Sequence, residues 1–216
     1  MLTLYGHPFS SYTWKALIPL YANGTAFEFR QIGGANADDD AFVAAASPLG
    51  NFPVLVDGAV TVFEASCVVE YLHLHYPGPA PLLPADNGAA LEVRKLDRVF
   101  DISVMDAMQE IVLEYIRSPG NPDPQVGERV RDRLLRAYRW IEAWLETYPQ
   151  RGSITLIECA AAPSLFYADW VLQIPEEFER LRRWRTHLLA LPAVKRCVDD
   201  ARPFRSYFPL GAPDRD

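Results

Sequence analysis

The sequence predicts an α/β domain over residues 1–77 and an all-α domain over residues 88–216. Three observations carry this prediction. The first part alternates strand-like and helix-like patterns, the second part has only helical periodicity, and the proline-rich stretch "PGPAPLLP" lies between them. Such a change of pattern is typical of two domains joined by a linker, which we place at 78–87.

The first part reads as βαβ, a connecting helix, and ββα. Apolar or alternating runs predict strands at 2–5 and 26–32. Two β-branched runs around Asp57-Gly58 predict a hairpin, because Asp-Gly favours a two-residue turn between strands. The helices predicted in this part are 13–22, 38–46 and 64–76.

The second part is predicted to contain only helices. In the third of them, which contains "TLIECAAAPSLFYAD", Thr155 and Glu158 have the spacing of a capping box. Pro163 falls inside this helix and is expected to bend it. The predicted helices are 88–117, 124–148, 155–172, 177–190 and 193–201.

Composition excludes several classes of function. The formal net charge is −7 and the sequence pI is about 5.1, without a basic cluster, which argues against a nucleic-acid partner. The sequence has neither a basic leader nor an apolar run of about 18 residues, so we expect a cytoplasmic protein without a membrane span.

Cysteines and histidines do not suggest a metal site. Cys67, Cys159 and Cys197 are far apart and form no CxxC pair, so we expect reduced, buried thiols. His73 and His75 are two residues apart and therefore lie on different sides of a helix, which makes a poor metal pair.

Ser10 and Ser11 lie between the first predicted strand and the first predicted helix. The unpaired N–H groups and the dipole of a helix N-terminus attract an anion. A serine hydroxyl at this point either caps the helix or donates a hydrogen bond to a bound anion. The residues alone leave both interpretations open.

Two further features flank the hairpin. Pro53 precedes it, and from the scarcity of cis X–Pro bonds the default interpretation is a trans edge proline. A cis bond would instead turn the backbone of Phe52 outward, toward a peptide-like ligand. Glu64 and Ser66 open the next helix, either as capping residues or as a carboxylate for a ligand ammonium group beside free N–H groups.

In this order and spacing, the motifs resemble the glutathione transferase superfamily. The resemblance covers essentially the whole chain and rests on "SSYTWK" with Lys15, "GNFPVL", "FEASCVVEYL" and the Thr155–Asp169 stretch. It implies a thioredoxin-like first domain, a helical second domain and a cytosolic homodimer active in detoxification. It also implies glutathione as co-substrate, a small electrophile as acceptor, a cis proline at position 53, and no metal.

The resemblance assigns roles residue by residue. Ser10 matches the serine that activates the glutathione thiol, and Ser11 is then expected to cap the helix. The residues implied in glutathione binding are Ser10, Ser11, Asn51, Phe52, Pro53, Glu64, Ala65 and Ser66. The residues that could line an apolar acceptor pocket, or else belong to the core, are His7, Tyr12, Val104, Met108, Tyr115 and Phe166.

Three departures keep other functions open. Ala65 replaces the family's serine, Asn51 replaces the usual lysine or glutamine, and "ADDDA" in the second helix lacks a cation for the glycine carboxylate. Two alternatives follow. One is a glutathione-dependent cis–trans isomerase of the zeta type, although Tyr12 replaces the cysteine of that class's Ser-Ser-Cys opening. The other is a non-catalytic binding or regulatory protein on the same fold.

Overall fold

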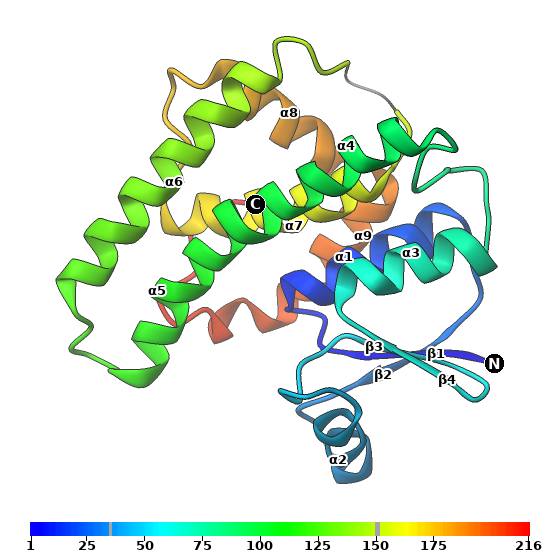
Figure 1. The fold of residues 1–216 in the computed structure, drawn as a ribbon. Coiled ribbons are helices and arrows are strands. Elements are labelled where there is room, and N and C mark those ends of the chain that lie inside the picture. The colour runs from blue at the N-terminus through cyan, green and yellow to red at the C-terminus, as the bar shows by residue number, and fades with distance from the viewer. Residues whose placement is uncertain (35, 150–151) are drawn as a thin grey trace.

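The computed structural model describes residues 1–34, 36–149 and 152–216, and its α/β part lies beside a helical part (Figure 1). The strands form one mixed sheet in the order β2-β1-β3-β4. β1 runs parallel to β2 and antiparallel to β3, which is antiparallel to β4. The strands are β1 (Leu2–Gly6), β2 (Glu28–Gln31), β3 (Val54–Asp57) and β4 (Val60–Phe63). The predicted thioredoxin-like order is confirmed.

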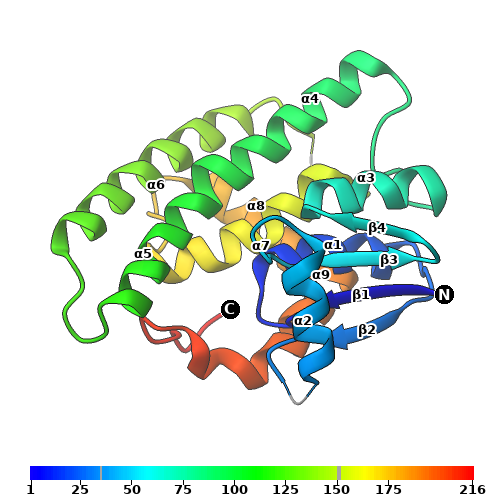
Figure 2. The same ribbon diagram turned by 60° about the horizontal axis from the view of Figure 1, so that its bottom comes forward.

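Helices cover both faces of this sheet. α1 (Ser11–Ala22) and α3 (Ala65–His75) lie on one face, and α2 (Ala37–Ala46) lies on the other (Figures 1 and 2). α1 packs against α3 on one side and against helices of the second part on the other. Its side chains Trp14 and Ile18 are fully buried. The start of α1 is therefore held at the junction of the two parts.

Two glycines are required where the chain turns. Gly58 has a φ of 59° in the β3–β4 turn, a conformation that side chains disfavour. Gly6 ends β1, and a Cβ there would lie 2.6 Å from the Thr13 hydroxyl oxygen. Only glycine lets the end of β1 approach the first turn of α1 this closely, and this approach places the loop over 7–10 at the junction.

The helical part differs from the prediction in two segments. The single helix expected over 88–117 is α4, then a π-helical stretch η1, then α5. A short 3-10 helix, η2, follows the last α-helix and was not predicted. The elements are α4 (Asn87–Arg98), η1 (Val99–Met105), α5 (Asp106–Arg117), α6 (Pro124–Trp144), α7 (Leu156–Val171), α8 (Glu179–Ala190), α9 (Pro192–Ala201) and η2 (Arg202–Tyr207).

α7 is the central helix of this part, and nearly all of its residues are buried. The predicted capping box is confirmed: the Thr155 N–H donates to the Glu158 carboxylate at 2.8 Å, and the Thr155 hydroxyl caps the helix. Pro163 lies inside a helix that continues past it. The expected interruption therefore does not divide the element.

The buried core is continuous across the two parts. Even the stretch between them is fixed, because Leu82 and Leu83 are buried and the Leu156 N–H donates to the Leu82 carbonyl at 2.9 Å. We propose residues 1–77 and 88–216 as two domains with a docked linker at 78–87. Within the described ranges, no helix is both long and apolar enough to cross a membrane.

The cysteine prediction is correct for two of the three thiols. Cys159 and Cys197 are buried, whereas Cys67 is exposed. Ser66 and Val68, on either side of Cys67, face the interior from α3, so the helical period turns Cys67 outward. The expectation of a buried Cys67 is wrong.

Candidate functional site

A cavity of about 590 Å³ lies where the two parts of the molecule meet. Its walls come from the start of α1, the loop before β3, the start of α3, η1 with α5, and the segment after η2. The predicted residues that line it are His7, Ser10, Ser11, Tyr12, Asn51, Phe52, Pro53, Glu64, Ala65 and Met108. The fold thus brings together most of the residues that sequence reasoning selected.

Four predicted residues do not line this cavity. Val104 and Phe166 are buried core residues, and Tyr115 packs partly buried against the same core. These three residues therefore belong to the core and not to an acceptor pocket, the second of the two interpretations that the sequence left open. The fourth, Ser66, is buried, and its hydroxyl is engaged in a network of charged groups behind the cavity.

Ser10 is the residue that caps α1. Its Oγ accepts a hydrogen bond from the Thr13 N–H at 3.2 Å, while Ser11 is already the first helical residue and is buried. The expectation that Ser11 provides the cap is therefore wrong. Capping occupies only a lone pair, and a hydroxyl that accepts one hydrogen bond still has its own proton to donate. The Ser10 hydroxyl can cap the helix and donate to an anion at the same time.

The loop before β3 has the backbone that the family resemblance implied. The Phe52–Pro53 peptide bond is cis, contrary to the default interpretation from base rates. Both residues line the cavity. Asn51, beside them, is exposed at the same rim, where its N–H donates to the Ser47 hydroxyl at 2.9 Å.

Glu64 has an unusual backbone at the start of α3. Its φ is 66° and its ψ 114°, and among the described residues it is the one non-glycine with positive φ. Its side chain makes no capping hydrogen bond to the helix, so the capping interpretation does not hold. Backbone strain of this kind gathers at functional sites, where the surrounding structure enforces it. Here the strained backbone places a carboxylate at the cavity wall, next to the N-terminus of α3.

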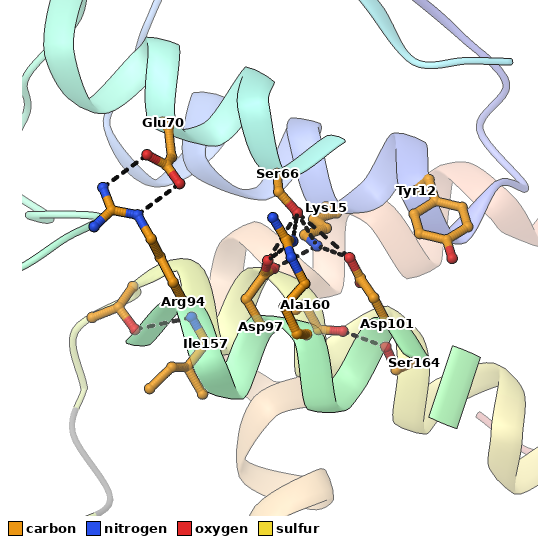
Figure 3. Close-up of polar contacts among 12 residues, drawn as sticks. Tyr12, Lys15, Ser66, Glu70, Arg94, Asp97, Asp101, Ile157, Ala160 and Ser164 are labelled. Carbon is orange, nitrogen blue, oxygen red and sulfur yellow. Dashed lines mark hydrogen bonds and ion pairs between the residues drawn. The ribbon is translucent and has the colours of Figure 1, made fainter. Parts of the chain in front are cut away.

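A buried ion cluster joins the two parts directly behind this wall (Figure 3). Lys15 Nζ lies 2.5 Å from Asp97 Oδ1 and 2.6 Å from Asp101 Oδ2. It also donates to Ser66 Oγ at 2.9 Å, and Ser66 in turn donates to Asp97. The side chains of Lys15 and Asp97 are each 1% exposed, whereas that of Asp101 is 18% exposed.

Asp101 connects this cluster to the cavity, which it lines. Burial raises the pKa of its carboxyl group, and the charge of Lys15 counteracts that rise. Sequence reasoning missed Asp101. The available signal was the pair Asp97 and Asp101, four residues apart and so on one face of a helical run, together with Lys15 on an otherwise apolar helix.

His7 and Tyr12 are both neutral groups in this site. The His7 Nδ1 accepts from the Phe9 N–H at 3.1 Å, which assigns the ring proton to Nε2, and burial lowers the pKa of the ring. The Tyr12 hydroxyl donates to Asp106 at 3.4 Å. Burial is the main cause that raises the Tyr12 pKa, and the negative charges of Asp101 and Asp106 raise it further, so the phenol keeps its proton.

The remaining walls are apolar and come partly from the end of the chain. Met108, Val112 and Ile116 of α5 face this side of the cavity. Tyr207, Phe208 and Pro209 close it from the segment that follows α9, and the Tyr207 ring stacks on His7 at a centroid distance of 6.1 Å. From the sequence we predict no element after residue 201, and the aromatic residues in "RPFRSYFPLG" are the signal in the sequence that this segment packs.

Two carboxylates are the charged groups of the cavity wall. They belong to Glu64 and Asp101, and the described lining contains neither lysine nor arginine. Nor do the residues that the structure describes include a group of three or more His, Cys, Asp or Glu side chains placed to hold a metal ion. The wall thus offers the Ser10 hydroxyl at the N-terminus of α1 and backbone N–H groups at the N-terminus of α3. The carboxylates of Glu64 and Asp101 line the same cavity.

Comparison with known proteins agrees with this arrangement. Residues 4–80 match the family model "Glutathione S-transferase, N-terminal domain". A maleylpyruvate isomerase from Ralstonia sp. is 26% identical over 99% of this chain and 99% of its own. The uncharacterized GST-like protein YibF from Escherichia coli K12 is 32% identical over 67% of this chain and 70% of its own.

Solved structures show the same fold. A glutathione S-transferase from Methylobacillus flagellatus KT, with glutathione bound, superposes with a TM-score of 0.78 at 24% identity. The match covers 91% of this chain and 98% of that one. The matched family model and the relatives that match along the chain agree with the cavity between the two parts. This chain therefore belongs to the glutathione S-transferase superfamily.

Proposed function

We propose that this protein is a glutathione transferase that binds glutathione in the cavity between the two parts and presents its thiolate to a small electrophile. One observation carries the proposal. The Ser10 hydroxyl at the start of α1, the cis Phe52–Pro53 bond and the strained Glu64 at the start of α3 all face one cavity. These features belong to three of the four stretches on which the resemblance to glutathione transferases rests.

The residues present fit glutathione at its γ-glutamyl end. Glu64 and Asp101 supply carboxylates for the ammonium group, and the N–H groups at the start of α3, beginning at Ala65, serve the neighbouring carboxylate. Phe52 offers its backbone to the peptide. Ser66, whose hydroxyl is engaged with Lys15 and Asp97, is not part of this proposed set.

Ser10 is the proposed catalytic residue, because its hydroxyl can donate to the thiolate. A thiol with a pKa near 8.5 must fall by roughly two units, about 2.7 kcal/mol, to be ionised at neutral pH. A hydrogen bond to a charged acceptor contributes about 1.5–3 kcal/mol and the helix N-terminus about 0.3–1 kcal/mol. The two together suffice without a general base.

The direct test measures binding and chemistry separately. Titration calorimetry with glutathione tests the site, and the ultraviolet absorbance of the bound thiolate tests activation. Conjugation to an uncharged nitroaryl chloride then tests transfer. An absence of glutathione binding at millimolar concentration would remove the proposal and favour a non-catalytic protein on this fold.

A zeta-type isomerase is the second candidate, because the Ralstonia relative named maleylpyruvate isomerase matches along 99% of the chain. The cavity wall favours conjugation instead. Its charged groups in the described lining are Glu64 and Asp101, which repel a dicarboxylate substrate. An isomerase turns over with glutathione in catalytic amount, whereas a conjugating enzyme consumes one thiol per product, so thiol titration during turnover separates the two.

A cytoplasmic homodimer is the proposed working state. Large apolar side chains stand exposed on β4, at Val60 and Phe63, and on α4, at Leu91, and exposed apolar surface of this kind favours association. Sedimentation velocity decides the oligomeric state: a sedimentation coefficient that fits one chain at micromolar concentration contradicts the dimer.

Glu64→Gln is expected to weaken glutathione binding by about 1.5 kcal/mol, roughly tenfold in dissociation constant. The loss is at the low end for a charge-assisted bond because the glutamine amide still accepts a hydrogen bond. The free energy of unfolding should change little, since the Glu64 side chain does not cap α3. Calorimetry measures the affinity, and a dissociation constant equal to that of the parent protein would remove Glu64 from the site.

Ala65→Ser restores the serine common in the family and is expected to tighten glutathione binding by about 0.5–1.5 kcal/mol. Ala65 lines the cavity at the first helical position of α3, where a new hydroxyl adds a donor for the γ-glutamyl carboxylate. The matched control is Cys67→Ser on the exposed face of the same helix, which should leave affinity unchanged. Equal effects of the two substitutions would contradict the proposed orientation of the ligand.

A further inference from the structure

The cations near the proposed glutathione site are already engaged. Residues 1–77 contain two cationic side chains, Lys15 and Arg30, against seven carboxylate side chains. Lys15 is 1% exposed and paired with Asp97 and Asp101 (Figure 3). Arg30 is paired with Glu28 at 2.9 Å and with Asp39 at 3.1 Å, and it lies over the Tyr5 ring.

Cations of the helical part near the site are engaged in the same way. Arg98 pairs with Asp97 at 2.5 Å and donates to Ser66 at 3.0 Å. Arg205, on η2, pairs with Asp216 at 3.0 Å and lies over the Trp170 ring. The charged side chains that reach the described cavity wall are Glu64 and Asp101.

Glutathione carries two carboxylates and one ammonium group, besides the thiol. The ammonium group is matched by Glu64 and Asp101, the γ-glutamyl carboxylate by the N-terminus of α3, and the thiolate by Ser10 at the N-terminus of α1. In the proposed binding mode the glycine carboxylate lies toward the rim formed by Asn51 and Ser47, which line the cavity and are uncharged. The surrounding domain, residues 1–77, has a net negative charge.

Resting on the proposed function, we propose that this site prefers a thiol peptide in which the glycine carboxylate of glutathione is neutralised as an amide or ester. Neutralisation removes a negative charge that the net negative domain repels, with Glu64 and Asp101 in the cavity wall as its nearest charged groups, and it leaves every matched group in place. The ligand class is therefore γ-glutamyl-cysteinyl peptides with an uncharged C-terminal end.

The test compares two thiols by titration calorimetry on the intact protein, namely glutathione and its glycine monoethyl ester. For two like charges about 8 Å apart, repulsion corresponds to a factor in affinity of about two in bulk water and about thirty near a protein surface. We expect the ester to bind about fivefold more tightly. Because the repulsion is screened by salt, raising the salt from low to about 0.5 M should narrow the difference.

A cation placed at the rim should reverse the preference. Asn51→Lys adds a charge at the cavity wall, while Leu49→Lys adds the same charge two residues away at a side chain that is 82% exposed and does not line the cavity. We expect Asn51→Lys to tighten glutathione several-fold more than the ester. The uncharged variant Asn51→Gln and the control Leu49→Lys should both keep the ester preferred.

Each outcome decides between the proposals. Binding of neither thiol overturns the proposed function itself. Equal affinities, or tighter binding of glutathione to the parent protein, overturn the inference and leave the transferase proposal standing. A preference for the ester that Asn51→Lys removes and Leu49→Lys does not supports the inference.

Discussion

Lys15→Met is expected to lower the free energy of unfolding by about 3–5 kcal/mol, because it leaves two carboxylates without their buried cation. Lys15 Nζ lies within 2.6 Å of both Asp97 and Asp101, and the Lys15 and Asp97 side chains are each 1% exposed. Methionine fills a similar volume, so the loss reflects charge rather than a cavity. Urea unfolding measures it.

The same helices offer a matched control. Arg94 and Glu70 pair at 2.8 Å between α4 and α3 (Figure 3), but their side chains are 42% and 31% exposed. Arg94→Met breaks this pair and should cost under about 1 kcal/mol, since solvent screens exposed ion pairs. Adding Asp97→Asn and Asp101→Asn to Lys15→Met should recover part of the loss. Equal costs for Lys15→Met and Arg94→Met would contradict the account of the cluster.

The cost of Lys15→Met should also depend on pH, with a definite sign. Burial raises the pKa of the Asp101 carboxyl and Lys15 counteracts the rise, so removing Lys15 raises that pKa further. A carboxyl whose folded pKa exceeds its unfolded pKa binds protons preferentially in the folded state, and stability then falls as pH rises between the two values. The deficit of Lys15→Met should therefore shrink as pH is lowered from 7 toward 4. A deficit that grows on acidification would exclude Asp101 as its source.

The order of the elements was predictable because local patterns specify it. Alternation marked the strands, Asp57-Gly58 marked the hairpin, and the Thr155–Glu158 spacing marked the start of α7. The π-helical stretch Val99–Met105 was not predictable, because over two turns its pattern is that of an α-helix. It packs against α6 and α7, and π-helical stretches of this kind are frequent at functional sites.

The candidate site was predictable only where motifs mark it. Phe52, Pro53 and Glu64 belong to short local motifs, and they line the cavity. Asp101 and Tyr207 come from distant parts of the chain, and their approach to the site depends on how the helices pack. Val104 and Phe166 were selected by residue type, which does not distinguish a pocket wall from a core position such as theirs.

Ser10→Ala is expected to raise the pKa of the bound glutathione thiol by about one to two units, since each unit is about 1.36 kcal/mol and one charge-assisted hydrogen bond is lost. It should also cost about 1 kcal/mol of stability, because the Ser10 Oγ caps α1 through the Thr13 N–H. The two effects have different causes in one hydroxyl. The thiolate absorbance as a function of pH measures the first, and urea unfolding measures the second.

Ser10→Gly separates these two roles. Glycine at an N-cap costs only a few tenths of a kcal/mol, so the free energy of unfolding of this variant should be close to that of the parent protein. The pKa of the bound thiol should rise as much as in Ser10→Ala. Ser11→Ala is the neighbouring control: Ser11 is buried as the first residue of α1 and does not cap it, so the thiol pKa should stay in place. A thiolate lost in Ser11→Ala but kept in Ser10→Gly would assign activation to Ser11. A thiol pKa unmoved by any of the three variants would mean that neither serine hydroxyl ionises the thiol, and that the helix N-terminus acts without them.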